Sequence, residues 1–577
     1  MLSSLLSPLY WCGGQDERQV APSKMTSWWS VLLSALLCAA VGARKLPGLG
    51  LGDVESVALP EGFLLGAGTS ALQTEGAVLE DGKKESVIDY NIRTAKNKDG
   101  KPVFPDPGRY ADSYHRYKED IAAAKELKLQ VYRLSVSWAR IFPDGDITKP
   151  NMKGVEHYKN VLSEIVNAGM QPFVTMYHFD QPLEMIRQNL TWSDRRIVDN
   201  FVAYADFLFE NFGDKVKLWT TINEPNFYCT TYGVAPVLGL YEPGYADEHK
   251  CIHHSVLAHA KVYRLYETKY REKQGGKIGA AALTLWGRPN STAWDDIHAA
   301  DRLNVFGLGS IYSPLVYGDY PPEVRERIDR HSREEGLPES KLPSFSEEEK
   351  RIIAGTADFL CFNAYFGSRV VDTSYRPRPR IGKFADDQDA EEINYEHGQL
   401  KGLFMEPDPT VLWEASKWIW KNYKLPIFIT ENGWGDEREN ADPLQDEPRM
   451  GYHSEYLRGL LRAHDEEGVQ IMGYVIWSLI DTFEYTSGYT RRFGLVHVDY
   501  EGGTLKRTLK NSASFFQHIA ETRRVPVLTY DYKEDKADST TTTPGTSAAA
   551  SASLSIAVLS LALSRIITSQ ASPRLHC

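Results

Sequence analysis

The stretch Leu218–Asn226, Leu-Trp-Thr-Thr-Ile-Asn-Glu-Pro-Asn, begins as an apolar segment and ends in polar residues. Its apolar and β-branched residues favour a β-strand. Because Pro225 cannot donate to a sheet ladder, we expect the strand to stop at Glu224. The sequence therefore predicts a carboxyl group at the tip of a buried strand, with the amide of Asn223 just before it. An ordinary polar turn is the simpler interpretation of such a tip when it occurs alone.

A second stretch has the same form. Residues Pro426–Gly433, Pro-Ile-Phe-Ile-Thr-Glu-Asn-Gly, are an apolar run that ends in a glutamate, an asparagine and a glycine. We expect a strand over Ile427–Thr430. Two strands that each deliver a carboxyl group to a tip supply the acid and the nucleophile that glycoside hydrolysis requires. We therefore take Glu224 and Glu431 as the candidate catalytic residues.

Outward from these two stretches, strand-like runs alternate with segments of helical periodicity. The strand-like runs begin near Phe63, Val131, Pro172, Val216, Lys277, Phe359, Ile427 and Ile471. Such alternation predicts parallel strands joined by helical crossovers, and eight of these units close into one (β/α)8 TIM barrel, here over residues 55–525. A doubly wound open sheet is the alternative, but the sequence has no Gly-x-Gly-x-x-Gly turn of the dinucleotide-binding kind.

Polar or aromatic residues stand where the expected strands end. Such barrels place their active site at the C-terminal ends of the strands, so these residues should converge. They are Gln73, Trp138, His178, Glu224, Tyr365, Glu431 and Trp477. Two irregular regions interrupt the alternation: residues 286–355 contain a helical insertion rich in charge, and residues 374–402 are a long polar loop. Long loops at this face of a barrel shape the ligand entrance.

Composition narrows the class of protein. The 577 residues include 42% hydrophobic ones, which is ordinary for a globular chain, and carry a net charge of −12, which argues against nucleic acid as a main partner. The six cysteines form no Cys-x-x-Cys pair, so we expect no zinc site. Cys229 and Cys251 flank one loop and could pair in an oxidising compartment, but separate thiols, with Cys361 as the third, are an equal alternative.

The first 43 residues have the form of a leader and signal peptide. Lys24 precedes an apolar run, Trp28–Val41, that closes on small residues and ends at Ala43. The run is short for a membrane span. We therefore expect a protein that is secreted or displayed on the extracellular cell surface. In such a protein the sequons at Asn189 and Asn290 predict N-linked glycosylation.

The last 52 residues differ in composition from the barrel segment. Residues 526–547 form a polar, Ser/Thr-rich linker, and residues 548–577 contain a short apolar tail. Small residues, a spacer and an apolar tail are the form of a GPI-anchor signal, which would attach the protein to a membrane through a lipid. Arg565 and the polar end depart from that form, so an uncleaved tail is the alternative. The sequence gives no indication of the oligomeric state.

Several ordered motifs resemble one enzyme family. Thr221–Pro225 and Ile429–Gly433 resemble the two signature segments of glycoside hydrolase family 1, the β-glucosidases and their relatives. Further matching motifs are Tyr132–Ser135, Tyr177–His178 and Arg492–Leu495, and the resemblance extends from Leu59 to Ile519. It implies a retaining β-glycosidase, specifically a β-glucosidase, that acts on a small glycoside and needs no metal or other cofactor.

The resemblance also implies a role for each matching residue. Glu224 matches the general acid/base and Glu431 the nucleophile, while Arg133 and Tyr365 match groups that contact the nucleophile. A carboxylate beside an arginine stays ionised, as a nucleophile must. The residues that match sugar-binding positions are Gln73, His178, Asn223, Tyr365, Trp477, Glu484 and Tyr485. Without the two glutamates, His178 and Trp477 would be read as ordinary core residues and Arg133 as an ion-pair partner.

The chain departs from the family pattern at two positions. The family usually has Trp where Phe179 and Tyr485 stand, so the preference between glucose, galactose and fucose is left open. Glu484 argues against a 6-phosphosugar, because a carboxylate repels phosphate. A myrosinase-like thioglucosidase is one alternative; plant-type ones replace the acid/base that Glu224 retains here. The other is a non-catalytic sugar-binding or receptor-like relative, which typically lacks one of the two carboxyl groups.

Overall fold

The computed structural model describes residues 50–97, 99–104, 108–393, 407–438 and 441–529. The chain divides into two units, Met1–Ala43 and Arg44–Cys577, and every described residue belongs to the second. The leader, the C-terminal tail, all but the first four residues of the linker and residues 394–402 of the predicted polar loop lie outside the described residues.

Eight parallel strands of the described chain form a closed barrel. In order around the barrel they are β2 (Leu64–Gly68), β3 (Val131–Ser135), β4 (Gln171–Tyr177), β5 (Leu218–Ile222), β6 (Lys277–Thr284), β8 (Phe359–Ala364), β11 (Ile427–Asn432) and β12 (Ile471–Trp477). Strand β12 pairs with β2, from Gly473 opposite Leu64 to Trp477 opposite Gly68, and this pairing closes the ring. The predicted (β/α)8 barrel is thereby confirmed, and the open sheet is excluded.

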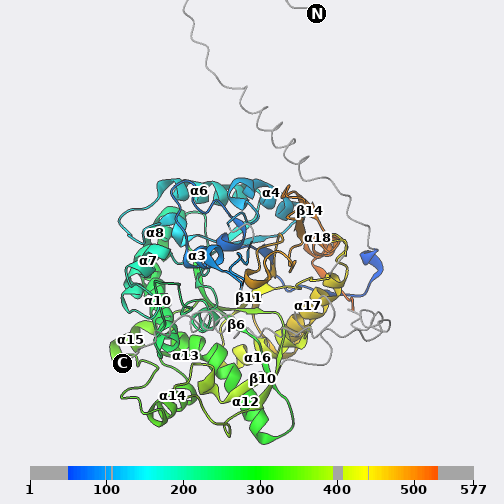
Figure 1. Cartoon of the computed structure of the whole chain (residues 1–577). Coiled ribbons are helices and arrows are strands. Elements are labelled where there is room, and N and C mark those ends of the chain that lie inside the picture. Colours follow the sequence, from blue (N-terminus) through cyan, green and yellow to red (C-terminus); the bar gives the residue numbers. More distant parts are fainter. Residues whose placement is uncertain (1–49, 98, 105–107, 394–406, 439–440, 530–577) are drawn as a thin grey trace, which may run out of the picture. The chain divides into compact units, whose positions relative to one another are not determined.

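Helices surround the barrel in the order of the chain (Figure 1). The larger ones are α4 (Ser113–Glu126), α6 (Met152–Asn167), α8 (Arg196–Phe212), α10 (Asp247–Lys269), α13 (Ser310–Tyr317), α16 (Thr410–Tyr423), α17 (Pro448–Glu467) and α18 (Ala513–Thr522). Helix α8 buries Ile197, Phe201, Tyr204 and Leu208, the spacing of one helical face. The first turn of α6, from Met152, is largely polar and carries little of the apolar periodicity that marks the rest of the helix.

Shorter elements connect or flank the barrel. The short helices are α2 (Ala71–Thr74), α3 (Val87–Thr94), α5 (Trp138–Ile141), α7 (Leu183–Arg187), α9 (Pro225–Tyr228) and α11 (Arg271–Gln274). Two small antiparallel pairs are β1 (Ser56–Ala58) with β15 (Arg524–Pro526) and β13 (Val496–Val498) with β14 (Arg507–Leu509). The β1–β15 pair joins the two ends of the barrel segment.

The interior of the barrel changes from apolar to polar along the strands. An apolar layer is made by Val131, Phe173, Leu218, Ala281, Phe359, Cys361, Phe428 and Val475. Side chains two positions apart point to the same face of a strand. The positions two residues after Val131, Cys361 and Phe428 are therefore also interior, and they hold Arg133, Asn363 and Thr430. The apolar layer thus forms the floor beneath a polar layer at the C-terminal ends of the strands.

The two irregular regions follow the carboxyl ends of β6 and β8, which puts them at the predicted face of the barrel. Region 286–355 contains β7 (Gly287–Pro289), α12 (Trp294–Asn304), a π-helical turn (Val305–Gly309), α13, α14 (Pro322–Glu334) and α15 (Glu347–Ile353). Region 374–402 was expected to be a loop throughout, but its residues Ala390–Ile393 form strand β10. Strand β10 pairs with β9 (Ser368–Asp372), and β9 with β7, so a small sheet connects the two regions.

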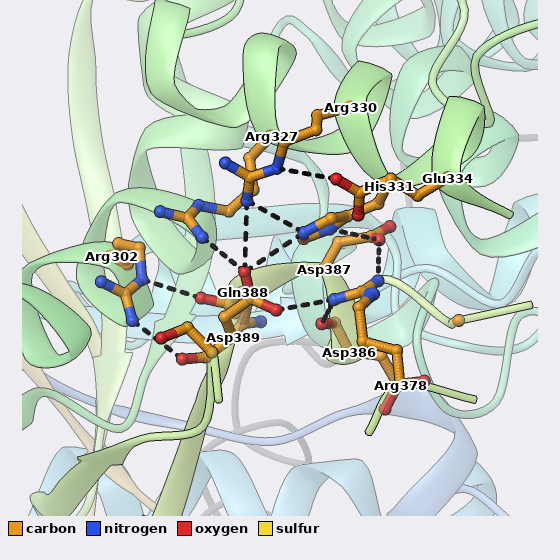
Figure 2. A network of polar contacts seen from close by, with 12 residues as sticks. Arg302, Arg327, Arg330, His331, Glu334, Arg378, Asp386, Asp387, Gln388 and Asp389 are labelled. Atoms are coloured by element: carbon orange, nitrogen blue, oxygen red, sulfur yellow. Dashed lines mark hydrogen bonds and ion pairs between the residues drawn. The ribbon is translucent and has the colours of Figure 1, made fainter. Parts of the chain in front are cut away.

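A buried ionic network holds the second region in place (Figure 2). Asp387, which is fully buried, lies 2.8 Å from Nε2 of His249 and 3.0 Å from Nζ of Lys341. In Figure 2, His331 of α14 lies between Asp387 and Asp389, with 3.2 Å from a ring nitrogen to each carboxylate. Burial alone would raise the pKa of Asp387, but hydrogen bonds from the histidines and the charge of Lys341 hold it well below its usual range.

Cys229 and Cys251 form a disulfide, with their Cα atoms 5.4 Å apart, so the first of the two alternatives is correct. It joins the segment after α9 to the start of α10, close in sequence to Glu224. Cys361 is a buried free thiol in β8. Asn189 and Asn290 are both exposed, as glycan acceptors must be. In the part of the chain that the structure describes, no helix is long and apolar enough to cross a membrane.

Candidate active site

Glu224 lies at the point where the chain leaves strand β5. The strand ends at Ile222, and Pro225 opens helix α9, which leaves Asn223 and Glu224 between the two elements. The backbone of Glu224 is left-handed, with φ 44° and ψ 56°. Such a conformation is uncommon for a residue with a side chain and is found at sites where the surroundings require it. The Glu224 side chain is thereby turned into the barrel mouth and is almost fully buried.

Glu431 lies within β11, which continues to Asn432 and so runs two residues beyond the predicted end at Thr430. The register of β11 against β8 shifts between Ile429 and Glu431. A β-bulge of this kind re-aims side chains near active sites. As a result, consecutive residues both reach the interior: Thr430 contacts Asn363, and Glu431 contacts Arg133.

Two donors hold the carboxylate of Glu431, one at each oxygen. Nη1 of Arg133 donates to Oε1 at 2.6 Å, and the hydroxyl of Tyr365 donates to Oε2 at 2.7 Å. Both contacts favour the charged form of the carboxyl group. Glu431 is therefore held in one orientation and paired with a cation, as a carboxylate nucleophile requires.

Arg133 also orients the neighbouring amide. Its Nη2 donates to Oδ1 of Asn223 at 2.9 Å, which turns Nδ2 of Asn223 toward Nε2 of His178 at 3.4 Å. Burial, and then the charge of Arg133, lower the pKa of His178 well below its usual value, so the ring is neutral. Nδ1 of His178 has no hydrogen-bond partner among the described residues. This nitrogen is available to a hydroxyl group of a ligand.

Asn363 contacts the carboxyl group of Glu224, and we had not assigned it a role from the sequence. Its Nδ2 donates to Oε1 of Glu224 at 2.6 Å. The period-two pattern of β8 carried the signal: Phe359 and Cys361 face the interior, so Asn363 must as well. Attention to the strand tip at Tyr365 obscured it.

The pKa of Glu224 is raised well above its usual range. Burial is the larger cause and the negative charge of Glu431 the second, while the hydrogen bond from Asn363 opposes both. The site thus pairs a carboxyl group whose protonated form is favoured with one that is ion-paired to a guanidinium, the combination that suits a general acid and a nucleophile.

Glu484 is the acceptor in a second polar group of the site. It accepts hydrogen bonds from Nε2 of Gln73 at 3.2 Å, from Nε1 of Trp477 at 3.4 Å and from the hydroxyl of Thr482. Burial raises the pKa of Glu484 to about 7 despite these donors and the charge of Arg491. Gln73 follows β2 and Trp477 ends β12, so the closure of the barrel brings distant parts of the chain together.

Aromatic rings flank the polar side chains around Glu484. The ring of Trp477 stacks against His178, with the centroids 5.8 Å apart, which joins the two halves of the site. Tyr485, beside Glu484, stacks on Tyr232 at 5.0 Å and lies 6.3 Å from Phe179. The hydroxyl of Tyr485 has no partner within the described chain. Tyr232 was not singled out in the sequence; it follows α9 and carries no pattern that would mark it.

The comparisons with known proteins agree with this geometry. Residues 55–525 match the family described as Glycosyl hydrolase family 1. The chain belongs to this family. It is 37% identical to Myrosinase 1 of Brevicoryne brassicae, over 80% of this chain and 98% of that protein. Beta-glucosidase 42 of Arabidopsis thaliana is 38% identical, over 79% of this chain and 93% of the relative.

A solved structure extends the comparison to three dimensions. A rice β-glucosidase mutant in a covalent complex with Glc has a TM-score of 0.73 at 31% identity, covering 82% of this chain and 98% of its own. Family membership, the closed barrel and the two carboxyl groups at its mouth together make this chain a glycosyl hydrolase.

Proposed function

We propose that the protein is a retaining β-glucosidase that hydrolyses a small β-glucoside by double displacement. The observation that carries the proposal is the contrast between the two carboxyl groups. Arg133 and Tyr365 donate to the two oxygens of Glu431, whereas burial and the charge of Glu431 favour the protonated form of Glu224. Retaining enzymes need such a pair, with the groups about 5–5.5 Å apart.

In the first step the carboxylate of Glu431 attacks the anomeric carbon. The bond from that carbon to the leaving oxygen breaks, and Glu224 transfers its proton to this oxygen. The product of the step is a glycosyl ester of Glu431 and a free aglycone. The rice relative solved in a covalent complex with Glc supports an intermediate of this type.

In the second step Glu224 acts as the base. Once Glu431 is an ester its charge is gone, and one cause of the raised pKa of Glu224 disappears. Glu224, now ionised, takes a proton from water while the water oxygen attacks the anomeric carbon. The bond from that carbon to Glu431 breaks, and its electrons restore the Glu431 carboxylate. The sugar is released with its original configuration, because two inversions restore it.

The remaining polar groups fit the hydroxyls of a hexose. Gln73, His178, Asn223 and Trp477 offer amide, imidazole and indole groups, and Glu484 offers a carboxylate. This mixture of donors and acceptors is what a sugar ring requires. Glu484 also disfavours a 6-phosphosugar, because its charge would repel the phosphate.

Proton NMR of a reaction in progress tests the proposal. With an aryl β-glucoside, the purified protein should release glucose that appears first as the β-anomer, followed by mutarotation. Initial release of the α-anomer would show inversion and would remove Glu431 from the role of nucleophile. A protein that turns over no glycoside at all would instead be the non-catalytic, sugar-binding relative.

A thioglucosidase is the second candidate, and the similarity to Myrosinase 1 is the observation that favours it. Hydrolysis of an S-glycoside needs little proton donation, because a thiolate is a good leaving group. A comparison of kcat/KM for a glucosinolate and for an aryl O-β-glucoside separates the two. We propose the O-glucoside as the better substrate, since Glu224 is retained and is kept protonated.

We also propose that the enzyme is exported and acts outside the cell, either free or on the surface through a lipid anchor. The leader over residues 1–43 and the apolar tail over residues 548–577 are the basis of this proposal. The Cys229–Cys251 disulfide and the exposed sequons at Asn189 and Asn290 support it, because both features suit an oxidising, glycosylating compartment.

A further inference from the structure

The orientation of the Asn363 side chain is fixed by hydrogen bonds that start at Arg133. A guanidinium group can only donate, so the atom of Asn223 that lies 2.9 Å from Nη2 of Arg133 is its acceptor, Oδ1. Asn363 presents an atom 3.2 Å from the same oxygen, and that atom must be the donor Nδ2. The polarity of both amides therefore follows from the charge of Arg133.

A second contact holds the other end of the amide. The hydroxyl of Thr430 donates to Oδ1 of Asn363 at 2.7 Å, and both residues are fully buried. Nδ2 of Asn363 is thus directed at Oε1 of Glu224, 2.6 Å away. A buried amide satisfied at both ends has little freedom to turn over. Oε1 of Glu224 consequently accepts a hydrogen bond whether the carboxyl group is protonated or not.

We propose that Asn363 keeps the transferable proton of Glu224 on Oε2 and thereby determines which oxygen of the general acid faces the leaving group. The inference rests on the proposed function of Glu224. A protonated carboxyl group has one hydroxyl oxygen and one carbonyl oxygen, and the carbonyl oxygen is the better acceptor. Because Asn363 occupies Oε1, the hydroxyl forms at Oε2.

In this scheme Oε2 of Glu224 gives up the proton in the first step and regains one in the second. In the first step the Oε2–H bond of Glu224 breaks as the O–H bond of the aglycone forms, and the electrons of the C–O bond pass to the leaving oxygen. In the second step the attacking water returns a proton to Oε2. Asn363 touches neither the sugar nor the water in this scheme, so it is a positioning residue that acts through Glu224.

The same hydrogen bond stabilises the charged form of Glu224, since it opposes burial and the charge of Glu431 in setting the pKa. Its loss should therefore raise that pKa further. The variant Asn363→Leu, which keeps the approximate volume and removes the donor, should move the alkaline limb of kcat/KM to higher pH. A residue that served only packing would lower activity without moving the limb.

The dependence of kcat/KM on the leaving group is the kinetic test of the proposal. For an alkyl β-glucoside, which needs full protonation, Asn363→Leu should lower kcat/KM by about 10–100-fold, a large part of what general acid catalysis supplies. For a dinitrophenyl β-glucoside, which needs almost none, the loss should be within about threefold. Equal losses for both substrates, with an unmoved alkaline limb, would overturn the proposal.

Thr430 supplies a matched pair of variants that leaves Asn363 in place. Thr430→Val removes the hydroxyl that orients the amide, so it should shift the pH limb and the leaving-group dependence in the same direction as Asn363→Leu, by a smaller factor. Thr430→Ser keeps the hydroxyl and should behave as the wild type. If Thr430→Val and Thr430→Ser gave the same pH and leaving-group dependence, this would contradict the orienting role of Thr430.

Titration by NMR tests the hydrogen bond without turnover. Glutamates labelled with ¹³C at Cδ are followed in a Glu431→Gln background, with Glu224 identified by the signal that Glu224→Gln removes. Adding Asn363→Leu should raise the pKa of Glu224, and an unchanged pKa would overturn the inference. This measurement keeps its meaning if the wild type turns out to hydrolyse no glycoside, a result that would overturn only the proposed function.

Discussion

Arg133 and Glu431 form an ion pair inside the barrel, with 2.6 Å between Nη1 and Oε1 and only 1% and 5% of the two side chains exposed. Few water molecules can screen the pair, so each charge depends on the other. Removing the carboxylate leaves an uncompensated cation beside an empty space. That space, next to the anomeric carbon of a bound substrate, is suited to a small anion.

The variant Glu431→Gly should accordingly lose hydrolysis and regain turnover when azide is added. Azide can occupy the vacated position, held by Arg133, and attack the anomeric carbon of an activated β-glucoside. We expect a fall in kcat of at least about 10⁴-fold without azide, on the scale at which removal of a nucleophile acts. The product should be the α-glucosyl azide, identified by its NMR coupling constants.

Glu431→Gln is the control for this experiment. It fills the same volume without a charge, so azide should not rescue it. If azide restored both variants equally, or if the product were the β-azide, Glu431 would not be the group that occupies the position of attack.

Glu224→Ala should discriminate between leaving groups. The variant loses proton donation to the aglycone, so kcat/KM for poor leaving groups should fall by about 10²–10⁴-fold, whereas dinitrophenolate should leave almost as fast as from the wild type. Because the variant also loses the base for the second step, the glycosyl-enzyme should accumulate and give a burst of phenolate. A plot of log kcat/KM against the pKa of the leaving group measures the effect. A slope equal to that of the wild type would contradict the role of Glu224.

Tyr485→Trp should change the preference between glucosides and galactosides. Tyr485 lies beside Glu484, and its hydroxyl is buried without a hydrogen-bond partner in the described chain, so a hydroxyl of a bound sugar would satisfy it. Exchanging a phenol for an indole N–H changes one directional hydrogen bond, which alters the ratio of kcat/KM values by about 1–3 kcal/mol. Tyr485→Phe, which removes the hydroxyl and keeps the ring that stacks on Tyr232, isolates the contribution of that hydroxyl. An unchanged ratio in both variants would show that Tyr485 does not reach the sugar.

Asp387→Asn should destabilise the fold near neutral pH. The substitution leaves the buried Lys341 and the partly buried Arg378 without their shared carboxylate, and breaking such a network costs about 3–5 kcal/mol. The depressed pKa of Asp387 means that its contribution is fully present above about pH 4 and is lost as pH falls toward the lower pKa of the folded state. Denaturant unfolding from pH 7 down to about pH 2 should therefore show a constant difference in stability between the two proteins above about pH 4, and a difference that narrows as the pH falls below it.

The exposed substitution Asp301→Asn on α12 is the control for the network and should stay within about 0.5 kcal/mol of the wild type. A difference between Asp387→Asn and the wild type that stayed constant over this pH range would mean that the charge of Asp387 is not what stabilises the loop.

The exported protein should begin near Arg44, the residue after the predicted signal peptide. N-terminal sequencing of protein from a eukaryotic secretory host measures this, and an intact Met1 or Met25 would contradict it. Release from membranes by a phosphoinositide-specific phospholipase would support the lipid anchor. A secreted product that still carries Cys577 would exclude the anchor.

The barrel could be predicted because short-range patterns in the sequence indicate its strands and helices. Apolar runs of strand length alternate with helical periodicity, and parallel strands need crossovers of this kind, so the order of elements nearly fixes the topology. Element ends were less predictable. The end of β11 lies at Asn432 and not at Thr430, because a bulge keeps two polar residues in the strand, and polarity alone reads as a loop.

The two carboxyl groups proposed to be catalytic could be found because both stand at the ends of apolar strands, where charge is unexpected. Asn363 and Tyr232 could not be found in the same way. Asn363 is conspicuous only when the interior face of β8 is known, and Tyr232 contacts Tyr485 from a segment more than 250 positions earlier in the chain. Such pairings depend on the closure of the barrel, which sequence spacing does not describe.

The sequence by itself determined the (β/α)8 fold, the two glutamates and the family resemblance, because these depend on the periodicity of apolar residues and on short contiguous motifs. The tertiary structure decided which polar groups form hydrogen bonds and ion pairs with one another. Arg133 reaches Glu431 and Asn223 across the barrel, and Asn363 reaches Glu224 from a neighbouring part of the ring. Burial, more than the neighbouring charge, raises the pKa of Glu224, and burial is a property of the packed chain that only the folded structure has.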